Sequence, residues 1–363
     1  MKFGNDSSVT VENNGENQGM ITGANYGSMT QNQYGLGYSD TKALCLDIVH
    51  DEIAKYRAEA LIEAQRRSEE FFESIVRKLD DKKMTDAQAL AEFRNPAMQF
   101  DYFEAQKAYM KAGTPELAEM LSDILVERIS ESSRSLLQIA LGEAIRVAPK
   151  LIPAQMATLA LIFNIRYSHT PQVDHYDRLV FYLKGAILPI FKMGVSQNYS
   201  EFQHLYFAGC CQQQTFGKDL IEWFKESYSG VFMQGFMPEE VPKDSNNIDL
   251  DTLYPCLFTT CTYDSNKIQI AAFNKADLLV KIKEMSILPE HSELLQKTFK
   301  DNLLPNDKAK ELVEKLVPEM KEVFEYWNNS VIKNCILSSV GIVIAAEYSK
   351  KVNTYIYDLK MWI

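Results

Sequence analysis

Apolar side chains recur at a helical period in the segment that follows residue 38. Ser39 and Asp40 supply an N-cap, and one apolar stripe then extends to residue 79. The stripe makes nine steps over 33 residues, or about 3.67 residues per step, which is nearer to a straight helix than to a left-handed coiled coil. We therefore predict one long helix that packs on neighbours from its own chain or from a second one. The stripe consists of Leu46, Val49, Ile53, Tyr56, Ala60, Ala64, Phe71, Ile75 and Leu79, with Arg67 at the remaining step.

Helix signals are dense between residues 84 and 230. Asn95-Pro96 marks a break, and Thr114-Pro115 places an N-cap before a proline at the first helical position. The segments between these marks are amphipathic, and residues 154–167 are apolar nearly all round, which predicts a central buried helix. This part of the chain is therefore predicted to be a helical array.

The pattern changes after residue 230, where prolines and acidic residues make a turn-rich passage. Residues 256–263 and 267–273 flank Asp264-Ser265-Asn266, and their alternation predicts a small β-hairpin. Helical segments resume from Ala276. Apolar side chains at every second position of residues 354–363 predict a terminal strand, whose last residues are too apolar to be left in water and are expected to be docked.

Residues 1–38 form a head that is rich in Asn, Gln, Gly, Ser and Thr. Short apolar pulses about ten residues apart, separated by turn signals, favour short strands. One copy has too few apolar side chains to bury a core, whereas several copies can pair their strands and stack their amide side chains. A disordered tail is the alternative. We expect residues of the head and of the start of the long helix to mediate homo-oligomerisation. They are Val9, Val11, Met20, Ile21, Met29, Leu46, Val49, Ile53 and Tyr56.

The predicted fold class is mainly α. It comprises a helical array with a long N-terminal helix, a small β-hairpin and a C-terminal strand, preceded by the β-prone head. We predict four regions along the chain. They are the head (1–38), a long connecting helix (39–83), a helical body (84–235) and an α+β C-terminal region (236–363).

Composition narrows the classes of function. The chain has 363 residues, 46% of them hydrophobic, and 38 basic against 49 acidic side chains give a net charge of -11. This charge disfavours binding to long DNA but leaves room for a small nucleotide pocket. The N-terminus lacks the apolar run of a secretion signal, and no apolar stretch is long enough for a membrane-spanning helix. A cytoplasmic location is expected, with membrane contact only through an oligomer.

No established catalytic motif occurs in the sequence. The Walker and Rossmann glycine spacings are absent, and the six-residue separation of His169 and His175 does not suit a shared metal site. The six cysteines are expected to be free, buried thiols. Cys210 or Cys211 with His204 is the nucleophile-and-base pair nearest in sequence, but such a pair is unspecific. Arg77, Lys78, Lys82 and Lys83 complement the C-terminal end of the long helix. We therefore predict no catalytic residues, metal site or cofactor, and we assign no ligand-binding residues.

Several short motifs carry a resemblance that spans essentially the whole chain. The head leads into residues 38–47 (YSDTKALCLD), and these are followed by residues 95–99 (NPAMQ), 136–139 (LLQI), 148–151 (APKL), 338–342 (SSVGI) and 359–363 (LKMWI). In this order they resemble an uncharacterised family of bacterial proteins. Proteins with similar heads occur among anti-phage defence genes, so the resemblance implies an immune role and transfers no catalytic residues.

Three hypotheses of function follow. The first is a non-enzymatic, homo-oligomeric defence effector or scaffold, controlled by a ligand or a partner protein, whose assembled heads act on membranes or form a structural hub. The second is a sensor that binds a nucleotide or oligonucleotide signal and passes it to a partner. The third is an enzyme of unrecognised type.

Overall fold

The computed structural model describes residues 38–83, 91–131, 134–168, 173–353 and 357–363. The chain divides into two compact units, residues 1–69 and 70–363. The predicted strands of the head, with Val9, Val11, Met20, Ile21 and Met29, lie outside the described residues.

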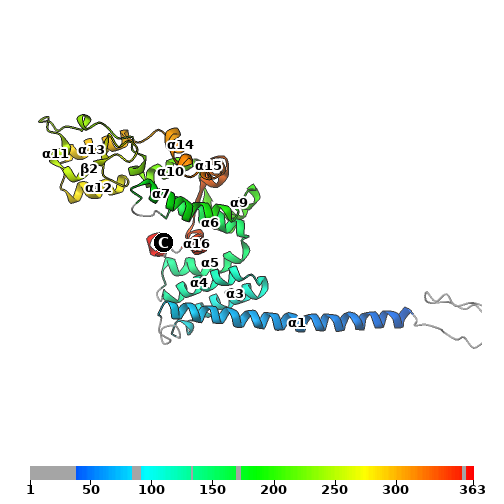
Figure 1. Ribbon diagram of the computed structural model, residues 1–363. Coiled ribbons are helices and arrows are strands. Elements are labelled where there is room, and N and C mark those ends of the chain that lie inside the picture. Colours follow the sequence, from blue (N-terminus) through cyan, green and yellow to red (C-terminus); the bar gives the residue numbers. More distant parts are fainter. Residues whose placement is uncertain (1–37, 84–90, 132–133, 169–172, 354–356) are drawn as a thin grey trace, which may run out of the picture. The chain divides into compact units, whose positions relative to one another are not determined.

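Helix α1 (Tyr38–Asp81) confirms the predicted long helix almost to the residue (Figure 1). It belongs to the first unit up to residue 69 and to the second unit from residue 70. In the first unit, every side chain described between residues 46 and 62 is exposed. None of the described helices combines the length and apolar composition that spanning a bilayer requires.

The second unit is built mainly from short helices, so the predicted mainly-α class is confirmed. The helices are α3 (Pro96–Ala112), α4 (Pro115–Ser130), α5 (Leu136–Val147), α6 (Pro153–Arg166), α7 (Tyr176–Tyr182), α8 (Leu188–Lys192), α9 (Tyr199–Phe207), α10 (Leu220–Ser227), α11 (Leu250–Leu253), α12 (Lys275–Glu284), α13 (Pro289–Asp301), α14 (Asn306–Leu316), α15 (Met320–Asn329) and α16 (Ser339–Ser349). Shorter turns are η1 (Ala148–Lys150), the π-helical η2 (Leu183–Ile187), η3 (Ser229–Phe232), η4 (Pro238–Glu240), η5 (Pro255–Leu257), η6 (Val331–Asn334) and η7 (Leu359–Met361).

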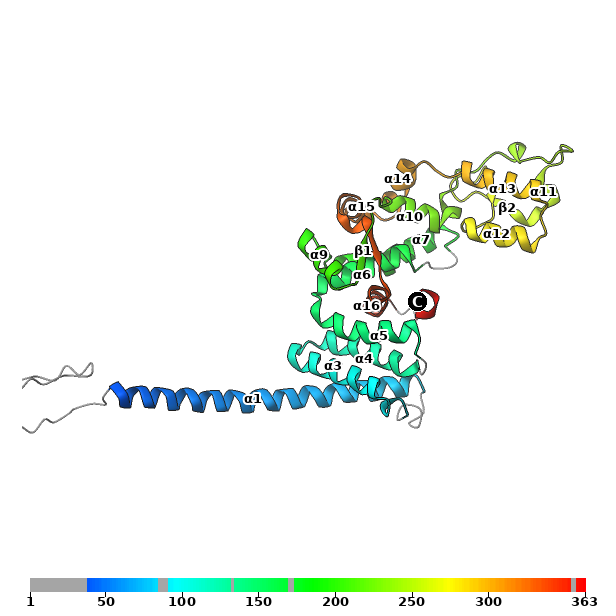
Figure 2. The same ribbon diagram turned by 180° about the vertical axis from the view of Figure 1, so that it is seen from behind.

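Helix α16 lies at the centre of the main hydrophobic core, between α5 and α6 in both views (Figures 1 and 2). Most of its side chains are apolar, and residues 341–349 are buried, as expected of a helix surrounded by others. Its main partner α6 confirms the predicted central buried helix, since residues 155–165 are buried. The buried amide of Asn164 on α6 donates a hydrogen bond to Ser349 Oγ on α16 at 2.7 Å, so a polar contact also fixes this pair.

Two small antiparallel sheets complete the described fold. Strands β2 (Phe258–Thr260) and β3 (Ile268–Ile270) pair with Thr259 opposite Gln269 and confirm the predicted hairpin. This hairpin, with α11, α12 and α13, surrounds a second hydrophobic cluster that includes Leu257 and Leu278. Strands β1 (Cys211–Gln213) and β4 (Cys335–Leu337) join segments that are distant in sequence.

The predicted C-terminal strand is wrong for the described residues 357–363. Residues Leu359–Met361 form the 3-10 turn η7, capped by the Asp358 side chain, which accepts a hydrogen bond from the Lys360 N–H. Of the alternating apolar side chains, Leu359, Tyr357 and Ile363 pack singly on the core without forming a paired strand. The predicted docking is confirmed for Trp362, whose indole packs 5.1 Å from the ring of Phe163 and donates a hydrogen bond to the carbonyl of Tyr167 at 3.0 Å, whereas Met361 is 74% exposed.

The close approach of α16 to the residue before β1 gives a test of the core. A Cβ atom on Gly341 would fall inside the contact distance of the Cys210 carbonyl oxygen, which is backbone and cannot swing away. Gly341→Ala is therefore expected to destabilise the protein by about 1–3 kcal/mol and to lower the thermal unfolding midpoint measured by circular dichroism. Gly185→Ala is the matched control, because nothing lies within 4 Å of its Cβ position. Equal midpoints for the two variants would contradict this packing.

Candidate functional site

The apolar stripe of α1 is the surface that sequence analysis singled out for assembly. Four members, Leu46, Val49, Ile53 and Tyr56, are between 40% and 61% exposed in the single chain. Their spacing of three and four residues places them on one side of the helix. Half-exposed apolar side chains in a continuous row are the pattern of a surface that another surface covers.

The same stripe is covered within the second unit. Phe71 and Ile75 are 0% and 1% exposed, and the ring of Phe71 lies 6.3 Å from that of Tyr102 and 5.9 Å from that of Tyr109, both on α3. Tyr109 also donates a hydrogen bond to the Glu70 carboxylate at 3.1 Å. Folding of the chain therefore accounts for the stripe from residue 71 onward.

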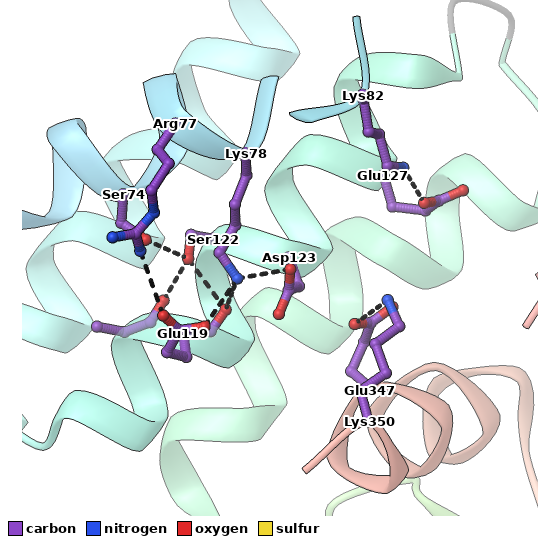
Figure 3. Close-up of polar contacts among 11 residues, drawn as sticks. Ser74, Arg77, Lys78, Lys82, Glu119, Ser122, Asp123, Glu127, Glu347 and Lys350 are labelled. Atoms are coloured by element: carbon purple, nitrogen blue, oxygen red, sulfur yellow. Dashed lines mark hydrogen bonds and ion pairs between the residues drawn. The ribbon is translucent and has the colours of Figure 1, made fainter. Parts of the chain in front are cut away.

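A row of ion pairs attaches the end of α1 to α4 (Figure 3). Lys78 Nζ lies 3.0 Å from a Glu119 oxygen and 2.6 Å from an Asp123 oxygen, and its side chain is only 13% exposed. One turn further, Lys82 pairs with Glu127. Because Lys78 is largely shielded from water, dissolved salt screens its two pairs less than it screens pairs between fully exposed side chains.

This row, which we call the α1 anchor, lines a cleft of about 330 Å³. Beneath the ion pairs, the hydroxyls of Ser74 and Ser122 lie 3.1 Å apart (Figure 3). The cations of the cleft are largely matched by carboxylates of α4. The arrangement therefore suits the attachment of one helix to another better than the binding of a charged ligand.

Sequence analysis missed the anchor because it assigned the cations at the end of α1 only to the helix dipole. The available signal was a matching spacing. Glu119, Asp123 and Glu127 recur every four residues on one face of α4, and Lys78 and Lys82 have the same spacing at and just past the end of α1. Two such rows can pair along their length when the helices lie side by side.

An ion pair between the buried Glu347 of α16 and Lys350, the residue after this helix, borders the anchor (Figure 3). Glu347 lies 2.6 Å from Lys350 Nζ, and its side chain is 3% exposed. Burial raises the pKa of the Glu347 carboxyl above its ordinary value of 4.5, although Lys350 opposes the shift. Asp123 and Glu127 act in the same direction as burial. Asp123 and Glu127, which pair with Lys78 and Lys82, therefore also raise the pKa of the Glu347 carboxyl.

The proposed pairing of Cys210 or Cys211 with His204 is not assembled. His204 Nδ1 lies 2.9 Å from the amide nitrogen of Gln155, and among the described hydrogen bonds it makes none to either thiol. Burial raises the pKa of the Cys210 thiol to about 12, and a hydrogen bond with Cys335, followed by burial, raises that of Cys211. Both thiols are therefore protonated and poor nucleophiles at neutral pH.

The cysteine expectation is confirmed for four residues and wrong for one. Cys210, Cys211, Cys261 and Cys335 are free and buried, whereas Cys256 is free and exposed. The side chain of Cys45 lies outside the described residues. Across the residues that the structure describes, no three side chains of His, Cys, Asp or Glu gather in the manner of metal ligands.

Comparison with known proteins places the chain in a family. A protein-family model with the description ":-like" matches residues 35–363. Because this match covers most of the chain, the chain belongs to that family. No curated protein and no solved structure matches it. The family match begins just before α1 and so leaves out nearly all of the head.

A pH experiment tests the environment of Glu347. Because its pKa is raised, the folded state binds more protons than the unfolded chain above pH 4.5, so this group costs stability as the pH rises through that window. Glutamine does not titrate. The difference in unfolding midpoint between Glu347→Gln and the unaltered protein should therefore shift in favour of the variant as the pH is raised from 4.5.

The control for this experiment is Glu325→Gln, which removes one negative charge from an exposed position on α15. Midpoints are measured at several pH values for all three proteins. A pH trend of the same size in the control would show that net charge, and not burial of Glu347, is responsible.

Proposed function

We propose that this chain is a non-enzymatic, homo-oligomeric effector or scaffold of bacterial anti-phage defence, in which the α1 stripes of two copies pack together. The observation that carries the proposal is the exposure of Leu46, Val49, Ile53 and Tyr56 on one side of α1. The immune context rests on the resemblance of the ordered motifs and the head to proteins of defence loci. The head of each copy precedes its α1, so parallel pairing of these helices brings the heads together and favours their joint strands.

A second copy fits the stripe better than a lipid surface does. Helices that lie on membranes carry mainly Lys and Arg on their polar face. Between residues 46 and 69, α1 has four basic residues, Lys55, Arg57, Arg66 and Arg67, but six acidic ones. The acidic residues are Asp47, Asp51, Glu52, Glu59, Glu63 and Glu69. An anionic bilayer is therefore a poor partner, whereas another mixed-charge helix is a suitable one.

The energetics predict an assembly that depends on concentration. Each of the four side chains is already about half covered, so complete burial adds about 1 kcal/mol apiece, or about 8 kcal/mol for both copies. The loss of translational and rotational freedom costs about 4–15 kcal/mol. The net free energy of association from the stripe alone is thus close to zero, and contacts between heads would decide how tightly the copies associate.

Light scattering on the purified full chain tests the assembly. Ile53→Asp combined with Tyr56→Asp places two charges in the stripe, and we expect a lower particle mass over a range of protein concentrations. The control is Ala58→Asp combined with Ile62→Asp. Ile62 is 69% exposed and lies nine residues, or two and a half helical turns, from Ile53, so it occupies the opposite side of α1. An equal loss of mass in the control would contradict pairing through the stripe.

Protection of bacteria against phage tests the biological part separately. In a plaque assay, cells that carry the stripe variant should lose protection, whereas cells that carry the opposite-face control should keep it. Full protection by a stripe variant that is monomeric would reject assembly as the basis of the function. Absence of protection by the unaltered protein against a broad phage panel would reject the defence role while leaving the assembly intact.

A further inference from the structure

A second cleft of the body has a different character from the α1 anchor. It has a volume of about 650 Å³ and is lined by residues of α3, the end of α4, and α5. This size lies within the range of about 300–1,000 Å³ that is typical of small-molecule sites. Its charged and apolar side chains include Phe100, Asp101, Arg128, Arg134, Ile139 and Arg146.

Arg128 is the unusual member of this lining. It is only 2% exposed, and its Nε donates a long hydrogen bond of 3.3 Å to Asp101 Oδ2. Its Nη1 is buried and has no hydrogen-bond partner among the atoms that the structure describes. Buried guanidinium groups normally satisfy their donors, so Nη1 of this cleft-lining residue is a buried donor that lacks its acceptor.

The carboxylates of the cleft do not neutralise its arginines. Asp101 is shared between Arg128 at 3.3 Å and Arg146 at 3.5 Å, and Glu143 pairs with Arg146 at 2.6 Å. Arg134 is exposed. Three arginines against two carboxylates leave one positive charge in a chain whose net charge is -11. The cleft is thus a local cationic site that favours an anion.

The other side of the lining is apolar. Phe100 is 68% and Ile139 is 48% exposed, so each presents an uncovered apolar surface near the arginines. An aromatic ring next to a group of guanidiniums matches a ligand that has a planar ring at one end and phosphate at the other, because rings stack on Phe and phosphates accept paired hydrogen bonds from Arg.

We propose that this cleft binds a nucleotide, with its phosphates against Arg128, Arg134 and Arg146 and its base on Phe100. The acidic surface elsewhere repels long nucleic acid, so the ligand is a mononucleotide or a cyclic dinucleotide. Because Nη1 is buried, binding requires the Arg128 guanidinium to turn toward the cleft, where a phosphate oxygen supplies the acceptor that Nη1 lacks. This site is independent of the α1 stripe, so either assignment can fail without the other.

Isothermal titration calorimetry on the full chain tests the ligand class with four probes: ATP, cyclic diguanylate, adenosine and inorganic phosphate. One of the two nucleotides should bind at least about 100-fold more tightly than either adenosine or phosphate, because only a nucleotide uses both ends of the cleft. The nucleotide that binds more tightly shows whether the ligand is a mononucleotide or a cyclic dinucleotide. Failure of both to bind at millimolar concentration, or phosphate binding as tightly as either, overturns the proposal.

Variants with matched controls locate the site. Arg134→Gln and Phe100→Ala alter exposed residues and should each weaken nucleotide binding about 10-fold or more. The controls are Arg178→Gln on α7, whose side chain is 55% exposed, and Phe181→Ala, which matches Phe100 with 69% exposure. Neither control residue lines the cleft, and neither substitution should change the affinity. Equal weakening by the controls, or unchanged affinity in Arg134→Gln and Phe100→Ala, overturns the location.

Arg128 is tested with its charge retained. Arg128→Lys keeps a cation but loses Nη1, so the rise in unfolding midpoint that the bound nucleotide gives the unaltered protein should shrink or vanish. An undiminished rise would show that Nη1 makes no contact with the ligand. If this buried substitution prevents folding, the exposed pair Arg134→Gln and Phe100→Ala still decides the proposal.

Discussion

A helix with an apolar stripe is stable in water only where another surface covers that stripe, and this constraint governs α1. The chain itself covers Phe71 and Ile75, and the ring of Phe71 lies against aromatic rings of α3. From Leu46 to Tyr56 the same periodic row remains about half exposed. A single physical rule therefore has two outcomes on one helix. Where the folded chain covers the stripe, α1 is part of the core. Where the folded chain does not cover it, the helix retains a surface suited to a second copy.

Helices α1 and α6 and the β2–β3 hairpin could be predicted because each follows from the order of apolar, polar and turn residues within its own segment. The period of the apolar row placed α1, the nearly uniform apolar composition of residues 154–167 placed α6, and turn residues placed the β2–β3 hairpin. The same reasoning was wrong at the C-terminus. Alternation at Leu359 and its neighbours is compatible with a strand, but the backbone there forms a 3-10 turn capped by Asp358. The indole of Trp362 donates a hydrogen bond to the carbonyl of Tyr167, the residue that follows α6. Periodicity alone does not distinguish a paired strand from side chains that dock singly.

The charged sites could be predicted only in part. The anchor has a sequence signal, because Lys78 and Lys82 match the spacing of carboxylates on α4, but the signal has meaning only when the two helices are known to be neighbours. The arginine cleft has no such signal in the sequence. Asp101 meets Arg128 from 27 residues away and Arg146 from 45 residues away. An unsatisfied donor such as Arg128 Nη1 is a property of the folded interior and cannot be read from residue types.

Helix α4 belongs to both charged sites. Glu127 pairs with Lys82, which directly follows α1, and the next residue, Arg128, lies in the wall of the arginine cleft. These neighbours project in different directions from a helix whose remaining side chains are mostly buried. A close-packed helix shifts as a unit rather than bending at one residue. Both charged sites therefore depend on the placement of this one helix.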